Sequence, residues 1–318
     1  MTAPASVVAS SRRVLVRHAR SFRLASIFLP REASDEAAIT YAFCREADDM
    51  ADEAPDLATA RASLSDLDAE LTGEVPPRLL VAAYLEVARS RSIPVEAAQE
   101  LLQGLRSDLK PVCVADDGEL MRYCYRVAGT VGLMMCGVLG VTSPEARAPA
   151  VDLGLAMQLT NICRDVLEDA GRGRVYIPAS RLAKVGLTPE DVLDPTLPRD
   201  LDRRARLATV VRDLLEVAEG AYTRAWRGMH HIPPRPRVAI HVAAVVYRSI
   251  GRRLLSLHQA DPIHGRTIVP RFRRWVGVGW GLLSALHPVS WGLGDSAGPS
   301  PLHVHLRGLG GAPSYVVS

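Results

Sequence analysis

The sequence predicts an all-α protein with a single domain. Alanine, leucine and arginine dominate its 318 residues, and runs of residues typical of strands are scarce. Apolar residues recur at spacings of three and four, the periodicity of helices that each bury one face. Hydrophobic residues make up 48% of the chain and charged residues 23%, so a large core can form and a fully disordered chain is excluded.

Breaks rich in proline and glycine divide the chain into the helices that we expect, in order. The intervals between the breaks span roughly 12 to 25 residues, an ordinary range for helices of globular proteins. No interval is polar enough for a linker, so we expect one domain over residues 13–268. The breaks lie at Pro30, Pro55, Pro76–Pro77, 92–94, 110–118, 143–144, 171–178, 194–198 and 233–236.

The two ends of the chain depart from this pattern. We expect residues 1–12 to be flexible, and residues 294–318, rich in glycine, proline and serine, to form a disordered tail. Residues 269–293 combine three of the four tryptophans with arginines, which is typical of a helix lying on a membrane surface. A last helix packed on the body would explain this segment equally. The short apolar run near the N-terminus predicts no signal peptide.

The net charge, the cysteines and several absent motifs exclude some classes of function for this protein. The net charge of +3 is too balanced to indicate a nucleic-acid partner. The five cysteines form no CxxC pair, which fits a reducing cytoplasm. The glycine motifs of nucleotide-binding folds and the zinc-protease motif HExxH are absent. His230, His231 and His241 lack acidic or cysteine companions at ligand spacing, so we do not expect them to bind metal.

The first chemically informative segment is an acidic stretch near residue 45. In a helix, Tyr41, Arg45, Asp48 and Asp52 fall within an arc of about 60°, with Asp49 beside them. Like charges one turn apart destabilise an isolated helix, so this face needs a counter-charge. The apolar residues that precede the stretch favour a buried helix.

A second polar stripe, Gln158, Asn161, Asp165 and Asp169, spans an arc of about 80° on a helix whose other faces are apolar. Amide and carboxylate groups are costly to bury without partners. Two aspartates one turn apart, with an amide oxygen behind them, suit Mg²⁺ held partly through water and phosphate. The glycine–arginine loop 171–174 that follows could close over phosphates.

A stripe of small residues, Gly129, Gly132, Cys136 and Gly140, lies between the two acidic segments. Glycine weakens a helix, so the stripe favours close approach of a partner, either another helix or a slender apolar ligand.

Taken together, the motifs resemble the squalene/phytoene synthase family, and within it the bacterial phytoene synthases. The resemblance runs from about His18 to Arg266 and implies an isoprenoid-synthase helical fold with a central cavity. The motifs that carry it are Ser21-Phe22, Arg45 with the aspartates that follow it, 123–132, 158–169, 173–178 and 247–250.

The resemblance implies a head-to-head prenyltransferase, a phytoene synthase. Two geranylgeranyl diphosphates would condense through a cyclopropylcarbinyl (prephytoene) diphosphate to phytoene, with Mg²⁺ (or Mn²⁺ as a substitute) and without NADPH. The implied metal ligands are Asp48, Asp49, Asp52, Asn161, Asp165 and Asp169, of which Asp48 and Asp165 are also expected to be catalytic. The implied substrate contacts are His18, Ser21, Tyr41, Arg45, Gln158, Arg164, Arg174 and Arg266. Tyr123 and Tyr247 are expected to stabilise cations or position a proton.

Three alternatives stay open on the sequence alone. A relative acting on farnesyl diphosphate would make presqualene diphosphate, squalene or the C30 dehydrosqualene. A chain-elongating prenyltransferase would explain the DDxxD pattern of residues 48–52, although 165–169 does not repeat it. A non-catalytic prenyl-binding or assembly protein would lack the metal-binding aspartates. We expect a cytoplasmic protein on the inner face of the cell membrane, because a C40 hydrocarbon cannot dissolve in cytosol, and a downstream carotenoid desaturase as a possible partner.

Overall fold

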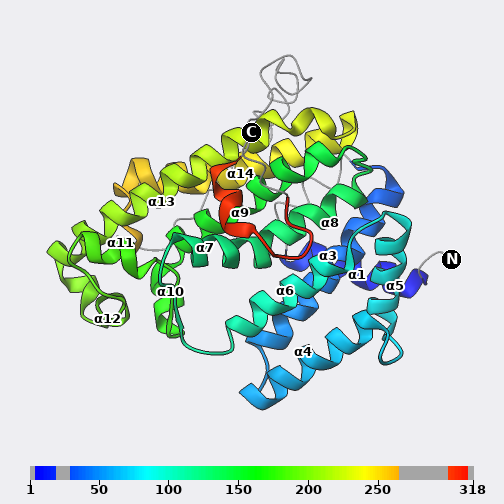
Figure 1. Cartoon of the computed structure of the whole chain (residues 1–318), viewed down its shortest axis with the longest axis horizontal. Coiled ribbons are helices and arrows are strands. Elements are labelled where there is room, and N and C mark those ends of the chain that lie inside the picture. The colour runs from blue at the N-terminus through cyan, green and yellow to red at the C-terminus, as the bar shows by residue number, and fades with distance from the viewer. Residues whose placement is uncertain (1–3, 19–28, 265–299, 314–318) are drawn as a thin grey trace.

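A computed structural model describes residues 4–18, 29–264 and 300–313 and confirms the all-α fold (Figure 1). A π-helical turn, η1 (Tyr125–Gly129), joins two of the helices. Short 3₁₀ turns occur at other breaks: η2 (Pro144–Ala146), η3 (Leu197–Arg199), η4 (Met229–His231), η5 (Pro262–His264) and η7 (Pro301–Leu306). The α-helices are α1 (Ala5–His18), α3 (Arg31–Asp52), α4 (Leu57–Thr72), α5 (Leu79–Ser90), α6 (Val95–Ser107), α7 (Asp117–Cys124), α8 (Thr130–Val138), α9 (Arg147–Arg164), α10 (Val166–Gly171), α11 (Ala179–Lys184), α12 (Pro189–Leu193), α13 (Leu201–Arg227) and α14 (Pro234–His258).

Most helices end where the sequence places its breaks, for local reasons; the breaks between α9 and α10 and between α11 and α12 were not predicted. Helix α4 begins at a side-chain cap, because Asp56 accepts a hydrogen bond of 2.8 Å from the backbone N–H of Thr59. It ends at Gly73, whose φ of 80° few other residues adopt. A capping box formed by Thr188 and Asp191 starts α12 in the same manner.

Two apolar clusters make up most of the core. One gathers side chains of α3, α4, α5, α6 and α8, and the other gathers those of α7, α9, α13 and α14. Helix α9 packs against α8, α13, α14 and the η1 turn, and it lies near the middle of the molecule (Figure 1). Polar residues on α9 are therefore held inside the protein.

A short parallel pair of strands, β1 (Val112–Cys113) and β2 (Arg174–Val175), was not expected from the sequence. Two residues per strand are too few to show an alternating pattern. The pair joins the chain after α6 to the loop after α10, with Val112 opposite Arg174. It thereby fixes the start of the segment that follows the second acidic stripe.

The N-terminal expectation needs a correction. Helix α1 begins at Ala5, and Val7, Ser11 and Leu15 are buried on one side of it. Residues 5–12 therefore form part of a packed helix instead of a flexible end. The four-residue spacing of Val7, Ser11 and Leu15 is the physical reason, since it places the three side chains on one face of α1.

The expected disordered tail is also wrong for residues 300–313. The η7 turn (Pro301–Leu306) packs on the body, where Leu306 and Leu309 are buried, and it lies beside α7 and α9 (red in Figure 1). Ser300 donates a hydrogen bond of 2.7 Å to the buried carboxylate of Asp152 on α9. The composition predicted disorder, but the burial of Leu306 and Leu309 and the hydrogen bond from Ser300 to Asp152 hold residues 300–313 against the body.

The segment 269–293, expected at a membrane surface or packed on the body, lies outside the described residues. Across the ranges that the structure describes, no helix combines the length and the apolar composition needed to cross a membrane.

Candidate active site

A polar cavity of about 210 Å³ brings the two acidic segments together. Side chains from α3, α6, α7, α9, α10 and β2 surround it, so α3 and the region from α9 to β2, which are far apart in the sequence, meet here. The residues that line it are Asp48, Ala51, Asp52, Leu105, Asp108, Tyr123, Gln158, Asn161, Ile162, Arg164, Asp165, Asp169, Arg174 and Tyr176. Most of the site residues predicted from the sequence thus face one space.

The α3 cluster consists of Asp48, Asp49 and Asp52, and Arg45 binds the first two of them. Its guanidinium donates to Asp48 over 3.0 Å and also forms an ion pair with Asp49. Burial raises the pKa of Asp48, while the charge of Arg45 opposes that shift and the charges of Asp52 and Asp49 add to it. The arginine is the counter-charge that the sequence required. A cation placed near Asp48 would also relieve the repulsion between these carboxylates.

The second stripe departs from the predicted continuous helix. Helix α9 ends at Arg164 and α10 starts at Val166, because Asp165 between them leaves helical geometry, with φ −104° and ψ 17°. Gln158, Asn161, Asp165 and Asp169 still line the same cavity. Burial raises the pKa of Asp169 to about 7, and the neighbouring charge of Asp165 adds to the shift.

Arginines neutralise these carboxylates. Arg164 donates to Asp165 over 2.7 Å, and Arg172 and Arg174 each donate to Asp52 over 3.0 Å. The basic loop expected to close over phosphates therefore reaches across to α3. Guanidinium groups at this place can bind carboxylate or phosphate with the same fork of donors.

Asp108 and Tyr176 complete the polar cavity, and neither role was predicted from the sequence. The carboxylate of Asp108 accepts hydrogen bonds from the hydroxyls of Tyr123, over 2.9 Å, and Tyr176, over 2.7 Å. The hydrogen-bonded residues lie 15 and 68 positions from Asp108. No local spacing could have revealed them, and the only signal was a lone aspartate after an apolar helix.

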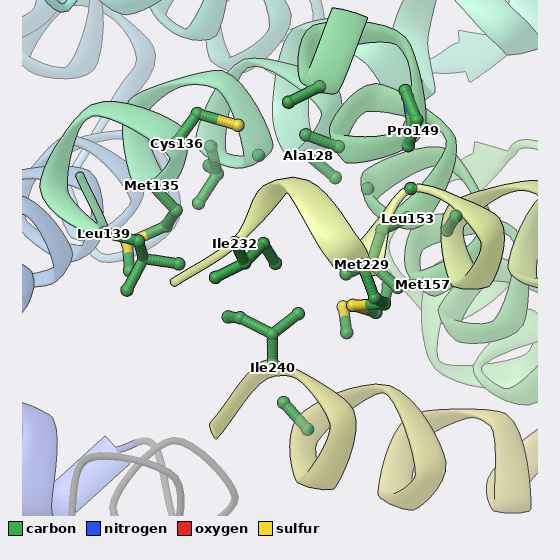
Figure 2. Close-up of a pocket in the computed structure, with 18 of the residues that line it drawn as sticks. Ala128, Met135, Cys136, Leu139, Pro149, Leu153, Met157, Met229, Ile232 and Ile240 are labelled. Carbon is green, nitrogen blue, oxygen red and sulfur yellow. The ribbon is translucent and has the colours of Figure 1, made fainter. Parts of the chain in front are cut away.

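An apolar cavity of about 250 Å³ adjoins the polar one, and Gln158 and Asn161 line both. Figure 2 shows that Met135, Met157, Ile232 and Ile240 surround a single space. Tyr247, on α14, also lines this cavity rather than the polar one. Polar and apolar ligand parts would thus be held side by side.

The small-residue stripe serves both predicted purposes. A Cβ atom on Gly132 would lie 2.5 Å from the carbonyl oxygen of Ala150, so α8 and α9 approach closely there. Gly132 and Cys136 also line the apolar cavity. The stripe therefore permits helix packing and leaves room for a slender ligand.

Several predicted substrate contacts lie elsewhere. Tyr41 packs near Leu15 and Ala38 between α1 and α3, and burial raises its pKa to about 12. Arg45 and Asp49 line a separate cavity of about 490 Å³ beside α1. Ser21, Arg266 and the side chain of His18 lie outside the described residues.

The donor set suits Mg²⁺ only together with other ligands. Within the described ranges, no three carboxylate, imidazole or thiolate groups form a ready-made metal site. Magnesium, however, usually takes one or two carboxylates and fills its other positions with water and substrate phosphates. The paired aspartates and the amide of Asn161 at one cavity meet that requirement.

The model of the squalene/phytoene synthase family matches residues 15–273. This chain belongs to the squalene/phytoene synthase family. Both acidic segments and the Tyr123 region fall inside the matched range, so the family's region of similarity contains the whole polar cavity.

Curated relatives and solved structures of other proteins match this chain over most of its length. It is 37% identical to the 15-cis-phytoene synthase of Enterobacter agglomerans over 250 residues, 74% of this chain and 82% of the relative. It is 38% identical to the phytoene synthase of Thermus thermophilus over 244 residues, 75% and 80% of the two chains. The crystal structure of a dehydrosqualene synthase with ligand superposes with a TM-score of 0.76 at 27% identity, covering 87% of this chain and 95% of that one.

Proposed function

We propose that this chain is a phytoene synthase that condenses two geranylgeranyl diphosphates head to head. The observation that carries the proposal is the adjoining pair of cavities, one lined by acidic clusters and arginines and the other apolar. A prenyl diphosphate has a charged head and a long apolar tail, and each part finds its matching surface. The names of the curated relatives favour phytoene as product.

The polar cavity would bind the diphosphates. Arg164 and Arg174 present guanidinium forks there, which suit phosphate oxygens. Asp48, Asp52, Asn161, Asp165 and Asp169 line this cavity and would hold Mg²⁺, whereas Asp49 lines the separate cavity beside α1 and is left out of this metal site. Magnesium, or Mn²⁺ in its place, supplies positive charge that stabilises the departing diphosphate.

The apolar cavity would protect the cations formed when diphosphate departs. Its lining of methionine, leucine and isoleucine excludes water, which would otherwise capture an allylic cation. The second prenyl chain would then attack, and the loss of one proton would close the cyclopropane ring of the cyclopropylcarbinyl diphosphate. Tyr247 in this cavity and Tyr123 at its polar neighbour offer aromatic faces that attract positive charge. A second ionisation, rearrangement and proton loss would give phytoene without NADPH.

We also propose that the protein works in the cytoplasm at the inner face of the cell membrane. A C40 hydrocarbon is insoluble in water, and the tryptophans and arginines of 269–293 are typical of membrane-surface segments. A carotenoid desaturase that consumes phytoene would be the natural downstream partner.

A relative using farnesyl diphosphate is the second candidate, because the dehydrosqualene synthase structure superposes over most of the chain. Mass spectrometry of the products separates the two. Purified protein with Mg²⁺ is given geranylgeranyl or farnesyl diphosphate, each with and without NADPH. Phytoene from geranylgeranyl diphosphate alone supports our proposal, a C30 product or presqualene diphosphate favours the rival, and no turnover of either overturns both.

A further inference from the structure

Asp108 is the carboxylate in the polar cavity that tyrosines, rather than arginines, hold. Its side chain is almost fully buried, with 9% of the residue exposed. Oδ2 accepts from the hydroxyl of Tyr123 over 2.9 Å, and Oδ1 accepts from that of Tyr176 over 2.7 Å. The two rings stack with their centroids 4.5 Å apart. Both hydroxyl directions are therefore set by a single carboxylate.

Arg174, a charged neighbour of Asp108, binds its main chain, so the carboxylate keeps its hydrogen bonds from the two tyrosines. Arg174, from β2, donates to the main-chain oxygen of Asp108 over 3.1 Å while it also binds Asp52 on α3. The charge of Arg174 lowers the proton affinity of the carboxylate and that of Asp52 raises it. Asp48, Asp52 and Asp165 are paired with arginines, whereas the hydrogen bonds to the Asp108 carboxylate come from Tyr123 and Tyr176.

We propose that Asp108, acting through Tyr123, takes up the proton that leaves the final carbocation. This inference rests on the proposed function, because phytoene formation ends in proton loss. The C–H bond next to the cationic carbon breaks and its electron pair forms the new double bond. The proton passes to the Tyr123 oxygen as the tyrosine's own proton moves to Oδ2 of Asp108. Tyr123 stays neutral, and the carboxylate becomes a carboxylic acid.

The protonation behaviour of Asp108 agrees with this role. Burial raises its pKa to about 6, although the hydrogen bonds from Tyr176 and Tyr123 lower it. An acceptor works best when its pKa lies near the working pH, because it is then ionised and still basic. Asp108 is thus a positioning residue for Tyr123 and the final acceptor of its proton.

The test follows the two halves of the reaction separately. Wild-type protein and Asp108→Asn receive geranylgeranyl diphosphate and Mg²⁺, and mass spectrometry measures cyclopropylcarbinyl diphosphate, C40 alcohols and phytoene over time. We expect Asp108→Asn to keep forming the cyclopropyl compound, but to convert it to phytoene about 100-fold more slowly, since general-base effects have that order of magnitude. Tyr123→Phe, which removes the relay, should show the same imbalance.

Two controls separate this role from a structural one. Asp68→Asn removes a carboxylate that pairs with Arg106 over 2.9 Å between α4 and α6, outside the cavity, and should leave the product ratio unchanged. If Asp108→Asn does not fold, Tyr123→Phe decides, because it removes the relay and leaves the hydrogen bond from Tyr176 to the Asp108 carboxylate in place.

The outcomes distinguish this inference from the proposed function. If the wild-type protein makes no C40 product, the proposed function fails. If it makes phytoene, and Asp108→Asn shows the wild-type product ratio, only the role of Asp108 is overturned. A wild-type product ratio in Tyr123→Phe would overturn it equally.

Discussion

Arg174 donates a hydrogen bond of 3.0 Å to Asp52 across 122 residues of sequence. This contact ties the α3 cluster to the loop that follows the second acidic stripe. The β1–β2 pairing fixes the main chain of Arg174 opposite Val112. This two-stranded sheet therefore helps to position the Arg174 side chain, which faces the polar cavity.

Replacing Arg174 with glutamine should reduce kcat/KM for geranylgeranyl diphosphate by about 10- to 100-fold. The variant loses charged hydrogen bonds, each worth about 1.5–3 kcal/mol, and with them a guanidinium that faces the cavity. Steady-state kinetics measures the effect. Arg172→Gln is the matched control, because Arg172 also binds Asp52 but is absent from the cavity lining. Equal losses in the two variants would contradict the role assigned to Arg174.

Asp48→Ala and Asp165→Ala should each reduce turnover by about 1,000-fold or more, because metal stabilisation of the leaving group contributes several kcal/mol. Each variant should also weaken the rise in melting temperature that Mg²⁺ and a non-reactive prenyl diphosphate analogue produce together. Asp66→Ala, exposed on α4, is the control. A variant of either cavity residue with full activity would exclude its metal role.

The sequence predicted what depends on local spacing. The helix breaks follow from proline and glycine, and the acidic faces around Asp48 and Asp165 follow from spacings of three and four; the structure places both faces at one cavity. Asp108 escaped notice because its partners lie on other elements. The order of residues 300–313 escaped for the same reason, since Ser300 binds Asp152, 148 positions away. Contacts between distant segments leave no periodic signal.

The C-terminal segment should stabilise the fold through Asp152. This buried carboxylate pairs with Arg224 over 3.2 Å, accepts from Ser300 and lies 3.3 Å from Nε2 of His303. Asp152→Asn should lower the free energy of unfolding by about 2 kcal/mol, somewhat less than for a fully buried pair because Arg224 is partly exposed. Denaturant unfolding followed by circular dichroism measures the change.

Removing residues 300–318 should destabilise the protein further, because Leu306 and Leu309 leave the core. The lost burial is worth about 3–5 kcal/mol for two leucines. Removing only residues 314–318 keeps every contact of Asp152 and both leucines, so the melting temperature should not change. Equal melting temperatures for the two truncations would show that the segment adds no stability.

Two helical glycines should respond in opposite directions to alanine. A Cβ on Gly154 would lie 2.5 Å from the carbonyl oxygen of Ala128, whereas one on Gly220 would meet only Nη1 of Arg224, at 3.5 Å. Gly154→Ala should cost about 1–3 kcal/mol of unfolding free energy through overpacking. Gly220→Ala should gain about 0.5–1 kcal/mol from helix propensity. Thermal unfolding of both variants tests the pair, and a gain for Gly154→Ala would refute the close helix contact.

His241 should make the protein sensitive to acid. Its ring is fully buried on α14, its centroid lies 4.6 Å from that of the Trp226 ring, and neither nitrogen has a hydrogen-bond partner among the described residues. Burial lowers its pKa to about 4, and the charge of Arg237 adds to the shift. Between pH 6.5 and 4 the unfolded chain therefore binds a proton that the folded protein does not, so stability falls as the pH falls.

Protonation of His241 can lower the free energy of unfolding by at most about 3 kcal/mol, because the pKa of its ring is 6.5 in the unfolded chain and about 4 in the folded protein. His241→Leu removes the titrating group and two unsatisfied nitrogens, so the variant should keep its stability at pH 7 and lose less of it toward pH 4. Urea unfolding at pH 7, 6, 5 and 4 gives both curves. His230→Gln, in the 3₁₀ turn before α14, is the control and should follow the wild type. Parallel curves for wild type and His241→Leu would mean that His241 is not the source of the acid sensitivity, because the variant can lose only what that ring contributes.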